Sequence, residues 1–256
     1  MFVNIRFTGK KTQYLNYKFK LFKSNKLNIK KTGIKHLTYK NELITCFLKK
    51  FSFQIVKKCT IFIEHLLIRN KYTNLVSKQT LFILYKKHFL DSLTILSILN
   101  SIWPMYSKRR CLDIGTGGGF PGFILSIITP QLYFCLIDSI RKKIQFHSKL
   151  SCFLELKNCY PLSIRAEILG KIKKHKNFYN LILARAVSDI SILIELSSPL
   201  LTKMGKLMMM KKIYGISEEI KNSLFSMCNK KIKIKTIIIT SARYEGKMIM
   251  ILKNLN

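Results

Sequence analysis

Apolar residues follow two different spacings along this 256-residue chain. From position 41 to about 101 they recur three and four positions apart, which is the periodicity of amphipathic helices. We expect three short helices there, over about 43–51, 61–67 and 81–99. After Pro104 the pattern changes to short apolar runs that alternate with amphipathic stretches. The chain therefore divides into a helical part and a part that mixes strands and helices.

The apolar runs of the second part have the lengths of buried strands, and they lie at 111–114, 133–137, about 162–164, 179–183, 206–210, 237–239 and 248–252. Strands that alternate with helices predict an α/β fold with a doubly wound, Rossmann-like sheet, parallel over most of its width. The last two runs are separated by the turn-like segment 241–246, too short for a crossover helix. We therefore expect an antiparallel hairpin at one end of the sheet.

Length and composition favour a single catalytic unit with a small accessory element. We divide the chain into a basic, poorly structured extension over 1–40, a small N-terminal helical element over 41–105 and an α/β domain over 106–256. These boundaries follow the change of pattern near Pro104 and the Lys-rich start of the chain.

A glycine-rich segment, DIGTGGGFPG at 113–122, follows the first predicted strand. Glycine allows a tight turn that brings bare main chain against a ligand, and proline suits the first turn of the next helix. Asp138 ends the next strand, 23 residues after Gly115, where a carboxylate can accept hydrogen bonds from both ribose hydroxyls of an adenosine. The alternatives are a purely structural loop and, for Asp138, an exposed helix cap.

The glycine spacing distinguishes between adenosine cofactors. The glycines at 115, 117, 118, 119 and 122 depart from the dinucleotide pattern GxGxxG, and no Gly-Lys-Ser/Thr follows as in phosphate-binding loops. A GxGxG run behind the acidic Asp113 resembles the first motif of methyltransferases. We therefore favour S-adenosylmethionine over a nicotinamide cofactor.

The charge balance points to a polyanionic partner. The chain has 46 Lys and Arg against 12 Asp and Glu, a formal net charge of +34 that would hold nucleic acid by counterion release. Basic segments at 108–110, 141–143 and 171–176 are candidates for following an RNA backbone, although each also suits an ordinary solvated face. Lysine also accumulates when a genome is rich in A and T, which explains part of the excess.

Several classes of protein are disfavoured. Seven cysteines without a CxxC pair predict reduced, buried thiols, with neither disulfides nor a metal site. No apolar run reaches the length of a membrane-spanning helix, so we expect no membrane partner. We expect a cytoplasmic monomer from an AT-rich bacterial genome. The alternative is an organelle, reached through the basic extension.

Longer stretches resemble a known family. They are CLDIGTGGGFPGFILSI at 111–127, LIDSIRKKIQF at 136–146, KHFLDSL at 87–93, RAE at 165–167 and ARA at 184–186. In this order, over roughly 40–253, they resemble the glucose-inhibited division protein B family, the 16S ribosomal RNA guanine-N7 methyltransferases. The resemblance implies a class I methyltransferase fold over 106–256, S-adenosylmethionine as cofactor and small-subunit ribosomal RNA as substrate.

The resemblance also implies seven contacts with the cofactor, at Gly115, Gly117, Phe120, Asp138, Ala166, Glu167 and Arg185. Asp138 would hold the ribose, while Ala166 and Glu167 would flank the adenine. Arg185, the one candidate catalytic residue, would lie at the mouth of the site and pair with the cofactor carboxylate or an RNA phosphate. The alternative for Arg185 is an ordinary surface ion pair.

The chemistry of guanine N7 explains why no catalytic dyad is visible. N7 carries a free lone pair, so its methylation needs positioning and no removal of a proton. The five histidines are scattered, and we expect each to serve packing or the surface, with His88 and Asp91 making an intrahelical contact or anchoring the N-terminal helices. The alternative function is a non-catalytic RNA-binding or ribosome-assembly factor on the same fold. The exact target nucleotide, and the choice between naked RNA and an assembling subunit, stay open.

Overall fold

The computed structural model describes residues 51–77, 88–102, 108–212, 216–229, 232–238 and 247–254. These residues belong to one compact unit, Leu37–Asn256. The extension expected over 1–40, most of the helix expected over 43–51 and the turn expected over 241–246 lie outside them. In the described part of the chain, no helix is both long enough and apolar enough to cross a membrane.

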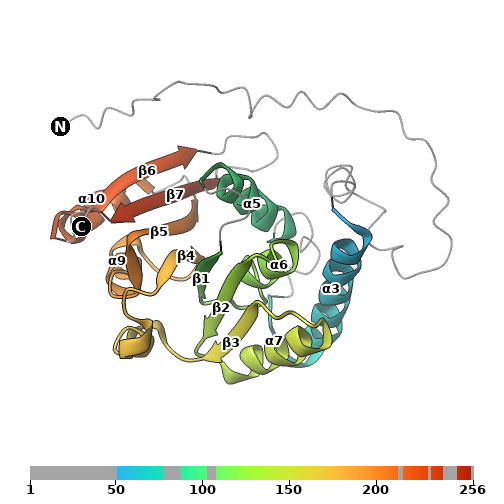
Figure 1. Cartoon of the computed structure of the whole chain (residues 1–256). Helices are drawn as coiled ribbons and strands as arrows, with labels where there is room; N and C mark the ends of the chain where they lie inside the picture. The colour runs from blue at the N-terminus through green and yellow to red at the C-terminus, as the bar shows by residue number, and fades with distance from the viewer. Residues whose placement is uncertain are drawn as a thin grey trace, which may run out of the picture. The chain divides into compact units, whose positions relative to one another are not determined.

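Seven strands form one sheet in the order β3-β2-β1-β4-β5-β7-β6 (Figure 1). Their bounds are β1 Arg109–Ile114, β2 Leu132–Asp138, β3 Cys159–Ser163, β4 Tyr179–Arg185, β5 Leu201–Lys212, β6 Ile232–Ile238 and β7 Lys247–Asn254. Strands β1 to β5 pair in parallel, which confirms the predicted α/β class. Strand β7 pairs antiparallel with both β5 and β6, so the last two strands form the pair expected at one end of the sheet.

Helices cover both faces of the sheet (Figure 1). One face carries α3 Phe53–Thr73, α5 Leu90–Ile102, α6 Gly122–Ile128 and α7 Arg141–Phe153. The other carries α8 Ala166–Leu169, α9 Ile190–Ser197 and α10 Ile216–Asn229, and a short 3₁₀ turn, η3 Lys173–His175, precedes β4. Consecutive residues of β1 show why: Cys111 belongs to the first core and Leu112 to the second, because side chains alternate across a strand.

Two elements differ from the sequence-based expectation. The middle N-terminal helix, α3, has 21 residues, starts after the N-cap Ser52 and ends at Asn74 in the left-handed conformation. The prediction missed both ends of this helix because they carry charged residues such as Lys57, Arg69 and Lys71, which are exposed. Strand β3 begins three residues earlier than expected and contains Pro161. An edge strand tolerates proline, since one side of its backbone makes no ladder bonds.

The register brings the carboxyl ends of the parallel strands to one edge of the sheet. Ile114 at the end of β1 pairs with Ile137 of β2 on one side and Ala184 of β4 on the other. The order of strands along the chain reverses at β1. In open α/β sheets, ligands bind at this switch point, beyond the carboxyl ends of the strands. The glycine-rich segment begins there.

Candidate methyl-donor site

The glycine-rich turn is crowded on every side except at Gly117. Gly115, Gly117 and Gly119 have φ angles of 66°, 55° and 93°, which L side chains rarely adopt. A Cβ atom at Gly115 would lie 2.8 Å from a methyl carbon of Val187, and one at Gly119 would lie 2.9 Å from the His147 ring. At Gly117 the nearest atom would be a main-chain oxygen at 3.8 Å. A ligand can therefore approach bare main chain at Gly117.

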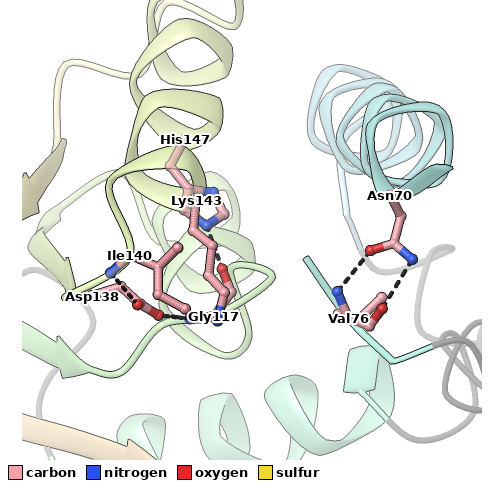
Figure 2. A network of polar contacts seen from close by, with 7 residues as sticks. All are labelled: Asn70, Val76, Gly117, Asp138, Ile140, Lys143 and His147. Carbon is pink, nitrogen blue, oxygen red and sulfur yellow. Dashed lines mark hydrogen bonds and ion pairs between the residues drawn. The ribbon is translucent and has the colours of Figure 1, made fainter. Parts of the chain in front are cut away.

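Asp138 lies beside this open position (Figure 2). Its Oδ2 atom accepts a hydrogen bond from the Gly117 N–H at 3.0 Å, and its Oδ1 atom accepts one from the Ile140 N–H at 2.9 Å. The Lys143 ammonium lies 3.6 Å from Oδ2. The side chain is 8% exposed, so the alternative of an exposed cap is wrong, although the bond to Ile140 does order the start of α7. A carboxylate can accept about four hydrogen bonds, so capacity remains for a ligand.

His147 holds the other side of Gly117, a contact that the sequence did not predict (Figure 2). Its Nε2 atom donates to the Gly117 carbonyl at 2.9 Å, which fixes the tautomer because a carbonyl can only accept. The side chain is 0% exposed, and burial lowers the pKa of His147 to about 4. A signal was available: His147 falls three residues after Ile144 and three before Leu150, on the buried face of α7. That pattern predicts burial but cannot name the partner.

Asp113, the acidic residue ahead of the glycines, orders the start of α6. Its Oδ2 atom accepts a hydrogen bond from the Gly122 N–H at 3.0 Å, and a Cβ atom at Gly122 would lie 2.6 Å from that oxygen. Burial raises the pKa of Asp113 to about 7, against the opposing effects of Thr116, the Gly122 N–H and the charge of Arg185. The carboxylate is thus committed to the protein, and Gly122 is required so that it can approach.

Helix α3 carries Asn70, which makes hydrogen bonds with Val76 in the segment after the helix (Figure 2). Asn70 donates to the Val76 carbonyl at 2.9 Å and accepts from the Val76 N–H at 2.7 Å. This pair fixes Val76 against the turn, because a Cβ atom at Gly118 would lie 2.5 Å from its side chain. No pattern in the sequence predicted this contact.

The structure places the other predicted contacts around the same edge. The Phe120 ring is buried, with its centroid 5.4 Å from that of Phe62 and 5.3 Å from that of His88. Ala166, which is buried, and Glu167, which is exposed, start α8 just beyond β3. The end of β3 is adjacent to Asp138 in the sheet, which brings this pair to the Asp138 side of the turn.

Arg185 ends β4 and joins it to the start of α5. Its guanidinium lies 3.5 Å from the Asp91 carboxylate and makes a hydrogen bond with His88 Nδ1. The two charged side chains are 12% and 3% exposed, so the alternative of an ordinary surface ion pair is wrong. His88 and Asp91 act as an anchor for the N-terminal helices. Within the described residues the Arg185 Nη1 group is buried without a hydrogen-bond partner, which leaves a donor for a ligand.

The described residues contain no group of three side chains suited to holding a metal ion. Five of the cysteines are described, all as free thiols. Cys59, Cys111 and Cys159 are buried, whereas Cys152 is exposed, so the expectation of buried thiols is wrong for Cys152.

Comparisons with known proteins show what this chain is similar to. A family model described as rRNA small subunit methyltransferase G matches residues 55–244. The ribosomal RNA small subunit methyltransferase G of Fusobacterium nucleatum is 36% identical over 168 residues, which cover 66% of this chain and 68% of that protein. The protein of the same name from Bacillus licheniformis is 35% identical over 187 residues, or 73% and 75% of the two chains. The crystal structure of the CurJ carbon methyltransferase shares the fold, with a TM-score of 0.53 and 14% identity over 73% of this chain and 61% of that one.

Proposed function

Because this chain belongs to the rRNA small subunit methyltransferase G family, we propose that it transfers a methyl group from S-adenosylmethionine to N7 of a guanine in small-subunit ribosomal RNA. The observation that carries the proposal is the Gly117 main chain, open to a ligand on one side and held on the other by Asp138 and His147. We also propose a cytoplasmic location and a monomeric enzyme.

Each predicted contact has a role in this proposal. Gly115, Gly117 and the main chain of Phe120 line the donor, and the free acceptor capacity of Asp138 takes the ribose hydroxyls. Ala166 and Glu167 flank the adenine at the neighbouring strand end. Arg185 offers its unpaired Nη1 donor to the carboxylate of the methionine moiety, since a forked guanidinium can serve Asp91 and a second carboxylate at once.

The residues around the turn fit a transfer that needs no base. When bound, the donor supplies an electrophilic methyl group on a sulfonium; the S–CH₃ bond breaks as the N7–CH₃ bond forms, and no proton moves. Asp113 is committed to Gly122, and His147 donates its only N–H to Gly117. The chain's contribution is therefore to hold N7 in line with the methyl group, and positioning can supply several kcal/mol of a barrier.

The test uses purified protein, labelled S-adenosylmethionine and small-subunit ribosomal RNA, as naked RNA and as the assembled subunit. We expect label to enter RNA as N7-methylguanine at one position. An Asp138→Ala variant should lose donor binding in calorimetry. Donor binding without any transfer to RNA would instead indicate a non-catalytic RNA-binding factor, and no donor binding at all would refute the proposed site.

A further inference from the structure

Two of the three basic segments seen in the sequence meet at the edge of the sheet opposite the donor site. Lys108 and Arg110 lie at the start of β1, and the lysines of 171–176 precede β4, which is the neighbour of β1 in the sheet. We call the exposed side chains of Lys108, Arg110, Lys171, Lys173, Lys174 and Lys176 the amino-edge surface. The third segment, 141–143, starts α7 at the carboxyl edge, near Asp138.

The charges of this surface are not neutralised by carboxylates of the described chain. Among the described residues, the ion pairs join Lys143 to Asp138, Arg185 to Asp91 and Lys211 to Glu219. None of these pairs includes a residue of the amino-edge surface. Six cations without carboxylate partners can neutralise the phosphates of a polyanion, and this releases the counterions condensed on that polyanion. This is the electrostatic requirement for a phosphate backbone.

The lysines are displayed on an ordered segment. The His175 N–H donates to Ile172 O at 2.9 Å, and the Asn177 N–H donates to Pro199 O at 3.0 Å. The His175 ring stacks on Tyr179, with centroids 5.9 Å apart, and makes a 2.8 Å hydrogen bond with its hydroxyl. An ordered segment loses little conformational entropy when it binds, so more of the electrostatic attraction appears as affinity.

An aromatic contact links the two halves of the surface. The Arg110 guanidinium lies 4.1 Å from the centroid of the Phe178 ring. The main-chain N–H of Arg110 donates a hydrogen bond to the side-chain oxygen of Asn180 at 3.0 Å. The cation–π contact directs the Arg110 charge toward the lysine segment. The strand start and the segment before β4 therefore present their charges together.

We propose that the amino-edge surface binds the phosphate backbone of the same RNA whose guanine is methylated at the carboxyl edge. The proposal rests on the proposed function. Strand β1 has six residues, so at about 3.3 Å per residue the two edges are roughly 20 Å apart. The partner must therefore be a folded RNA large enough to contact both edges, and a short piece around the target guanine would reach only one.

The experiment compares two triple variants of the full chain with equal charge. Lys171→Gln, Lys173→Gln and Lys174→Gln alter the amino-edge surface. In the control, Lys57→Gln, Lys149→Gln and Lys221→Gln remove the same charge from exposed positions on three separate helices. Each variant lowers the formal net charge of +34 by three. Methyl transfer is measured on full-length small-subunit RNA and on a short stem-loop that carries the methylated guanine.

We expect the amino-edge variant to raise KM for full-length RNA about tenfold. The slope of log affinity against log salt concentration should fall in magnitude by about two to three units, because each lost phosphate contact contributes close to one unit to that slope. Its kcat, donor affinity and KM for the stem-loop should equal those of the wild type, and the control should change KM less than twofold. Equal losses in both variants would mean that only bulk charge matters, and an equal loss on the stem-loop would place the contact near the target; either result overturns the proposal. Failure of the wild type to methylate any RNA would instead refute the proposed function.

Discussion

The buried imidazole of His147 gives the fold a calculable dependence on pH. The pKa of His147 is lowered from 6.5 to about 4 by burial; the Gly117 carbonyl and the Asp138 charge oppose this shift, and Lys143 adds to it. The folded state therefore favours the neutral ring, and this stabilisation is present above pH 6.5 and lost as the pH falls toward 4. Because proton binding is linked to unfolding, the difference between these two pKa values lowers the free energy of unfolding by about 2 kcal/mol between pH 7 and pH 5.

Asp113 acts in the opposite direction over the same range. The pKa of Asp113 is raised from 3.8 to about 7, so its contribution to the stability of the fold is present at low pH and is lost as the pH rises through 7. The gain on moving from pH 7 to pH 5 is again about 2 kcal/mol. The two groups nearly cancel in the wild type, so the unfolding free energy of the wild type alone does not reveal either one.

Single variants separate the two contributions. His147→Gln keeps an N–H for the Gly117 carbonyl but cannot titrate, and Asp113→Asn keeps an acceptor for Gly122. The free energy of unfolding is measured by urea unfolding followed by circular dichroism. Between pH 7 and pH 5, that of His147→Gln should rise by about 2 kcal/mol relative to the wild type, and that of Asp113→Asn should fall by about as much. A difference between wild type and His147→Gln that stays constant with pH would show that the ring is not held neutral, and the reasoning would fail.

Three further changes test the donor site. Asp138→Asn should raise the donor Kd by about tenfold to a hundredfold in calorimetry, because hydrogen bonds to a charged acceptor are worth about 1.5–3 kcal/mol; an unchanged Kd would remove Asp138 from the site. Gly117→Ala has room for its methyl group but must keep a φ of 55°, so we expect about 1–2 kcal/mol less stability and weaker donor binding, whereas a wild-type melting temperature would contradict the strained turn. Arg185→Ala leaves Asp91 buried without its cation and should cost about 3–5 kcal/mol in urea unfolding, with Asp91→Asn in the same background restoring part of it.

The sequence predicted the parts of the fold and site that depend on local pattern. Buried parallel strands are apolar on both faces, so they appear as continuous runs, and the turn of 113–122 and Asp138 lie at fixed offsets from those runs. The seven-contact site itself stays a prediction. The contacts made by His147 and Val76 depend on how α7 and α3 dock against the turn, which no spacing along the chain encodes. The partnership of Arg185 with Asp91 joins residues 94 positions apart in the chain and was missed for the same reason.

The two hydrogen bonds that hold Asp138 have a thermodynamic consequence for ligand recognition. Because the Gly117 and Ile140 N–H groups already orient the carboxylate, its rotamer is selected during folding and need not be selected again when a sugar arrives. Ligand binding then loses less conformational entropy at Asp138, and the binding enthalpy measured by calorimetry should come mainly from the new polar contacts. We therefore expect the backbone around Asp138 to be nearly the same with and without a bound ligand.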